Sequence, residues 1–120
     1  MNVILTAGPM LDAQVARTLW RAIVIHDPET ETSYLMGEDG REVPLPRFSR
    51  AVDDAHRVVA LMNSRGWTMT LKQVTEGTPH WLCAFVRDDG RTYVHTKAET
   101  MPLAICIAAL AAHRGQNVVP

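Results

Sequence analysis

The segment TMPLAICIAALAAHRG, residues 100–115, is almost without charge and carries helix signals at both ends. Thr100 is expected to cap the N-terminus, and Pro102 falls in the first turn, where its missing N–H costs no hydrogen bond. Gly115 follows the apolar run and fits a left-handed C-cap. The segment therefore predicts a helix with defined ends.

The apolar side chains of this predicted helix lie on nearly all of its faces. They are Leu103, Ala104, Ile107, Ala108, Leu110 and Ala111. In a soluble protein such a helix is buried against more than one partner. A membrane span needs roughly 20 apolar residues, and no run in the chain approaches that length. We therefore interpret the segment as the buried centre of a small domain.

The composition is that of an ordinary soluble domain. The 120 residues are 47% hydrophobic and 21% charged, with a formal net charge of −1. Residues 1–120 are expected to form a single domain, because a core of this size folds without disulfides or metals. The near-neutral charge argues against DNA as a partner. The N-terminus lacks a signal-peptide pattern, so a cytoplasmic protein with no membrane partner is expected.

Three segments before the last helix have strand patterns. Residues 67–74 alternate between apolar and polar, which is typical of a half-buried strand. Residues 80–87 are more continuously apolar, and residues 91–96 follow after a tight turn at 88–90. We expect a three-stranded antiparallel meander.

Two further helices are expected earlier in the chain. Between Pro9 and Ile25 apolar residues recur at helical spacing, with Asp12 off the apolar stripe. A second helix is expected from an N-cap at Ser49 to a left-handed C-cap at Gly66. Its apolar stripe is formed by Val52, Ala55, Val59 and Met62.

Turn-forming residues dominate the segment 26–46. This predicts a long connection that carries no more than a short hairpin of residues 33–36 and 41–43. The expected fold class is α+β, a small alpha-beta-alpha sandwich in which three helices pack with a three-stranded meander, in the order helix, helix, three strands, helix. The core is expected to contain Val59, Trp67, Phe85, Ile105 and Leu110.

Three stretches of the chain carry a family resemblance. They are LTAGPMLDAQVARTLW at residues 5–20, HDP at 26–28 with PLPRFSRAVDDAHRVVALMNSRGW at 44–67, and ETMPLAICIAALAA at 99–112. In this order they resemble the phage alpha-beta-alpha sandwich domain family and, more distantly, the NinX-type phage proteins. The resemblance implies the sandwich fold and a phage or prophage source, and hence the host bacterial cytoplasm. It transfers no catalytic residue.

Patterns for catalysis or metal binding are weak. The five histidines are scattered, without the i, i+4 spacing common among metal ligands on one helix. Cys83 and Cys106 lie in apolar runs, which favours two buried thiols over nucleophiles, although a disulfide between them stays open. Asp53 and Asp54 fit the positive end of a helix dipole. We therefore expect no enzyme activity, no metal and no cofactor.

Aromatic and basic side chains gather on the second and third predicted strands. Such groups can stack on a base or bind a phosphate. A purely structural role stays open for each, as core packing or as ordinary surface charge. The candidate ligand-binding residues are His80, Trp81, Arg87, Tyr93, His95 and Lys97.

Two classes of function follow from these observations. In the first, a phage accessory protein acts by binding, as an anti-defence protein that sequesters a nucleotide signal or blocks a host protein. In the second, a structural or interaction protein forms a homo-oligomer without a small-molecule ligand. The apolar faces of the helix 101–114 favour a dimer or larger assembly, because a small sheet and two helices would leave part of it uncovered.

Overall fold

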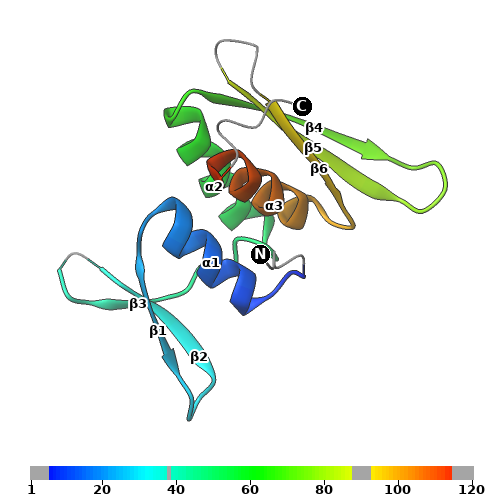
Figure 1. Ribbon diagram of the computed structural model, residues 1–120. Helices are drawn as coiled ribbons and strands as arrows, with labels where there is room; N and C mark the ends of the chain where they lie inside the picture. Colours follow the sequence, from blue (N-terminus) through cyan, green and yellow to red (C-terminus); the bar gives the residue numbers. More distant parts are fainter. Residues whose placement is uncertain (1–5, 38, 88–92, 115–120) are drawn as a thin grey trace.

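The computed structural model describes residues 6–37, 39–87 and 93–114. In these residues the elements are α1 (Pro9–Leu19), β1 (Ile23–Asp27), β2 (Thr32–Met36), β3 (Glu42–Pro44), α2 (Val52–Ser64), β4 (Trp67–Val74), β5 (His80–Arg87), β6 (Tyr93–Ala98) and α3 (Met101–Arg114). The described strands form two antiparallel sheets, the first of β1-β2-β3 and the second of β4-β5-β6. The helices lie between the two sheets (Figure 1), so the fold is an α+β sandwich.

Helix α3 is the centre of the core. Its side chains are buried from Pro102 to Ala112, with only Ile107 and Ala111 half-buried. It contacts α1, α2, β5 and β6. The Thr100 hydroxyl accepts a hydrogen bond from the Leu103 N–H at 3.4 Å, as expected of the N-cap. A single chain covers most of this helix, although Leu103 and Ile107 line a depression of about 450 Å³, and the expected assembly of several copies stays a prediction. The expected C-cap at residue 115 lies outside the described residues.

The second sheet confirms the predicted meander. Strands β4 and β5 have the predicted bounds and pair from Trp67 opposite Arg87 to Val74 opposite His80. Strand β6 ends two residues later than predicted, and the expected turn at 88–90 lies outside the described residues. The Thr96 hydroxyl donates to the Ala104 carbonyl oxygen at 3.1 Å and ties this sheet to α3.

The first sheet corrects two expectations about residues 9–46. Helix α1 ends at Leu19 rather than near Ile25, because Arg21 adopts a positive φ of 53° and the Ala22 N–H returns to the Ala16 carbonyl oxygen at 3.1 Å. The β-branched residues that follow form β1 instead of continuing the helix. Residues 26–46 are therefore a sheet and not a long connection, although the hairpin expected within them is present as β2 and β3.

A buried carboxylate joins α1 to the segment before α2. Asp12 was expected off the apolar stripe of this helix, yet it is fully buried. It accepts hydrogen bonds from the Ser49 N–H at 2.7 Å and the Ser49 hydroxyl at 2.5 Å. The Arg50 guanidinium bonds the same carboxylate at 2.9 and 3.0 Å. Ser49 therefore donates its hydrogen bonds to Asp12 and does not cap the helix. Helix α2 begins at Val52 without a side-chain cap.

The buried face of α2 also differs from the expected stripe. Ala55, Val58 and Met62 are buried, at the i, i+3, i+7 spacing of one helix face. Val59 is only half-buried, and Val52 is 44% exposed. The other residues expected in the core are buried: Trp67, Phe85, Ile105 and Leu110.

Both cysteines are buried in the core as free thiols, so the disulfide that the sequence left open does not form. Burial raises the pKa of Cys83 from 9.0 to about 12. Desolvation, with smaller contributions from the charges of Asp12 and Cys83, raises the pKa of Cys106 in the same direction. Neither thiol supplies a thiolate nucleophile at neutral pH.

We expect Asp12→Ala to lower the free energy of unfolding by about 3–5 kcal/mol, because the Ser49 and Arg50 donors lose a buried anionic partner. The exposed Asp53 in the first turn of α2 provides the control. Asp53→Ala should cost less than about 1 kcal/mol. Urea denaturation measures both values, and equal losses for the two variants would argue against the buried network.

We expect neither cysteine of the native protein to react with a thiol reagent at pH 8, and both to react after denaturation. Since the folded pKa of Cys83 is raised, its contribution to stability is complete below pH 9 and declines as the pH rises toward about 12. Labelling of the native and the denatured chain at pH 8, followed by mass spectrometry, measures the reactivity of each thiol. Rapid modification of the native chain would contradict the buried placement.

Candidate functional site

The six residues predicted to bind a ligand do not form one site. All six lie on the second sheet, but side chains alternate between its two faces. Trp81 and Arg87 belong to the face that packs on the helices, whereas the register places His80, His95 and Lys97 on the opposite face. Tyr93 begins β6 opposite Val86, and its side chain lies outside the described part of the chain.

His80 and Lys97 are the two predicted residues that share a depression on the surface. It has a volume of about 270 Å³, and its lining includes Glu99. The His80 ring already contacts the Thr78 carbonyl oxygen, with Nδ1 at 2.9 Å. The carboxylate of Glu99 opposes the binding of an anion here.

Trp81 and Arg87 make contacts within the domain. Trp81 is half-buried and packs against the core. The Arg87 guanidinium lies over the Trp67 ring, 5.1 Å from its centroid. This is a cation–π contact between cross-strand neighbours.

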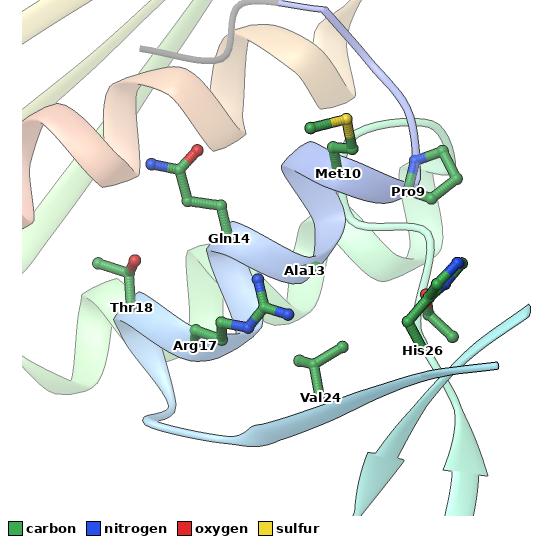
Figure 2. Close-up of a pocket in the computed structure, with 9 residues that line it drawn as sticks. Pro9, Met10, Ala13, Gln14, Arg17, Thr18, Val24 and His26 are labelled. Atoms are coloured by element: carbon green, nitrogen blue, oxygen red, sulfur yellow. The ribbon is translucent and has the colours of Figure 1, made fainter. Parts of the chain in front are cut away.

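A cavity with several polar side chains in its lining lies between α1 and the first sheet. We call it the α1 cleft (Figure 2), and its volume is about 470 Å³. In Figure 2 His26 of β1 lies at the same end as Pro9 and Met10, and Gln14 extends from α1 on the side away from β1. Its lining residues are Pro9, Met10, Ala13, Gln14, Arg17, Thr18, Val24, His26 and Ser33.

Two regular patterns build the α1 cleft. Met10, Ala13 and Arg17 recur at i, i+3 and i+7 and therefore share one face of α1. Val24 and His26 are two residues apart on β1 and point to the same side of the sheet. Sequence reasoning missed this site, because it extended the first helix over the strand that forms one wall.

The polar groups of the α1 cleft carry no negative charge. Arg17 is exposed and forms no ion pair with any described residue. On the sheet wall, His26 Nδ1 lies 3.2 Å from the Ser33 hydroxyl. The Gln14 side-chain oxygen is shielded from solvent and accepts no hydrogen bond from the described residues. The cleft thus combines the positive charge of Arg17 with the apolar side chains of Met10, Ala13 and Val24.

Two further kinds of feature are absent from the described residues. No group of three or more His, Cys, Asp or Glu side chains there could hold a metal ion. None of the described helices combines the length and the hydropathy of a membrane-spanning segment.

Comparisons with known proteins agree with this fold. The sequence model of the phage ABA sandwich domain family matches residues 13–110. A crystal structure of a phage protein from Bacillus cereus ATCC 14579 superposes with a TM-score of 0.68, at 18% identity, over 99% of each chain. Among curated proteins, none matches the sequence significantly. The match over most of the chain shows that it belongs to the phage ABA sandwich domain family.

Proposed function

We propose that this phage protein acts by binding rather than by catalysis, and that the α1 cleft holds a small anionic ligand of nucleotide size. Ligand pockets commonly have volumes of roughly 300–1,000 Å³, and the α1 cleft falls in that range at about 470 Å³. Sequestration of a nucleotide signal used by a host defence is the accessory role that such a site would suit.

The charge of the cleft lining carries this proposal. Among the described residues, no Asp or Glu lines the α1 cleft, and Arg17 stands at its wall without a carboxylate partner. A phosphate at Arg17 would gain charge-assisted hydrogen bonds. Apolar atoms of the same ligand would cover part of Met10, which is 74% exposed, or Val24 in the cleft lining.

Gln14 supports a ligand that also donates hydrogen bonds. Its side-chain oxygen is buried without a donor among the described residues, which is uncommon and costs roughly 1–3 kcal/mol. A ring amine or a sugar hydroxyl of the ligand would reach that oxygen after the Gln14 side chain turned from its position on the side of α1 away from β1 (Figure 2). The combination of anion, ring and donor is the chemistry of a nucleotide.

The polar pair in the α1 cleft favours binding over catalysis. His26 and Ser33 are cross-strand neighbours in the register of β1 and β2, which by itself explains their contact. Serine nucleophiles need a base that a third group orients. No third group from the described residues bonds the His26 ring.

A second candidate function rests on the outer face of the first sheet. The register places Ile23, Ile25, Tyr34 and Met36 on the face opposite Val24, which packs toward the core. Ile23 is 64% exposed. Apolar side chains on both faces of a sheet favour cover by another molecule, and this supports the alternative of a homo-oligomer or of a contact with a host protein.

We expect Arg17→Ala to weaken nucleotide binding by about 1–3 kcal/mol, because it removes the charge-assisted bonds to phosphate. Arg114→Ala is the matched control, since it removes the same charge from an exposed position at the end of α3. Isothermal titration calorimetry against linear and cyclic nucleotides measures the difference.

The same titrations with Lys97→Ala and His95→Ala test the second sheet as the site. A ligand whose affinity falls in those variants but not in Arg17→Ala would place binding on the second sheet. Equal affinities in Arg17→Ala, Arg114→Ala and the parent protein would contradict the assignment of the α1 cleft.

For the alternative function, Ile23→Lys should convert an assembly of the 13.3 kDa chain to a monomer, because it places a charge in the apolar contact. Val52→Lys is the control, since Val52 is also exposed but lies on α2. Native mass spectrometry reports the subunit number. A monomeric parent protein at tens of micromolar would remove the homo-oligomer.

A further inference from the structure

A second, smaller pocket lies where the ends of α2 and α3 meet the second sheet. We call it the basic pocket, and its volume is about 220 Å³. None of its lining residues lines the α1 cleft. The lining consists of Met62, Arg65, Trp67, Arg87, Ala112 and His113.

Three basic side chains reach the basic pocket from three different elements. Arg65 directly follows α2, Arg87 ends β5, and His113 lies in the last turn of α3. Chain folding therefore brings together groups that are far apart in the sequence. The like charges of Arg65 and Arg87 repel each other in one small pocket, and an anion bound between them relieves that cost.

Two of the three basic groups are held in place by contacts that leave donors free. The Arg87 guanidinium lies over the Trp67 ring, with its carbon 5.1 Å from the ring centroid. Arg65 uses one terminal nitrogen to donate to the Leu19 carbonyl oxygen. Because a guanidinium has five N–H donors, both groups retain donors for a ligand.

No carboxylate of the described residues neutralises these groups. The described ion pairs belong to Arg41, Arg50 and Arg57. Asp88 and Asp89 follow Arg87 in the chain and lie outside the described residues. Basic residues at helix C-termini commonly balance the helix dipole, but that explanation covers the helix positions and not Arg87 on its strand.

We propose that the basic pocket binds a phosphoryl group. Two guanidinium groups and an imidazole that approach from different elements offer more donors than a planar carboxylate has oxygens to accept. A tetrahedral phosphoryl group with two negative charges matches this set. The apolar atoms of Met62, Trp67 and Ala112 limit the space around it. This site is separate from the α1 cleft, so it goes beyond the function proposed above.

The test uses inorganic phosphate added to the full, isotopically labelled chain at constant ionic strength, with chloride as the balancing anion. The reporter is the indole N–H resonance of Trp67, which lies beside Arg87. We expect a saturable shift of that resonance and little change in the indole of Trp20. Absence of a saturable shift at Trp67 would overturn the proposal.

Variants separate the basic pocket from general charge effects. Arg87→Ala and Arg65→Ala should each weaken phosphate binding about tenfold or more. Lys72→Ala removes the same charge from an exposed position on β4 and should change the affinity less than about twofold. Arg87→Lys keeps the positive charge, so it serves as the comparison if Arg87→Ala does not fold. If all four variants bound phosphate with the affinity of the parent protein, the proposal would be overturned.

Further titrations identify the source of the phosphoryl group. Tighter binding of AMP than of phosphate, with adenosine alone leaving Trp67 unmoved, would identify the end of a nucleotide. Equal binding of AMP and phosphate would identify the free ion, and both results support the site. Arg17→Ala should leave the shift of the Trp67 resonance by phosphate unchanged. A negative result for binding in the α1 cleft is therefore distinguishable from a negative result for binding in the basic pocket.

Discussion

The fold depends on the need to cover helix α3. Its residues from Pro102 to Ala112 offer no charged side chain to solvent, so every face must meet another part of the chain. Helices α1 and α2 and strands β5 and β6 supply that cover. Once they do, the helices form the middle of the molecule and the two sheets lie on either side (Figure 1). The surfaces left for other molecules are then mainly the two sheets and the depressions beside the helices.

A second constraint sets the position of α1 and, through it, of the first sheet. The buried carboxylate of Asp12 holds Ser49 and Arg50 against α1, and an uncompensated charge at this depth would be costly. The left-handed turn at Arg21 then sends the chain back along α1 as β1. The α1 cleft is the space between that helix and that strand, so its shape follows from a structural ion pair outside it.

The second half of the fold could be predicted from the sequence, because its signals are local. The apolar patterns of residues 67–74 and 80–87 predicted the bounds of β4 and β5, and the capping residues predicted the bounds of α3. The first half could not, because a stripe of apolar residues continued past the turn at Arg21, and periodicity does not detect a single residue with a positive φ. The buried role of Asp12 depends on a partner 37 residues away. For the same reason the predicted site residues were split between two faces, while the α1 cleft and the basic pocket depend on tertiary contacts.

The α1 cleft and the basic pocket are both rich in basic and poor in acidic groups, although the chain as a whole is nearly neutral. We therefore propose that this phage ABA sandwich protein binds a small anionic molecule. Native mass spectrometry of protein purified from bacteria, before and after addition of linear and cyclic nucleotides, tests it most directly. We expect a nucleotide adduct that stays intact on the protein. A bare chain with every nucleotide tested would contradict it and would favour a protein partner.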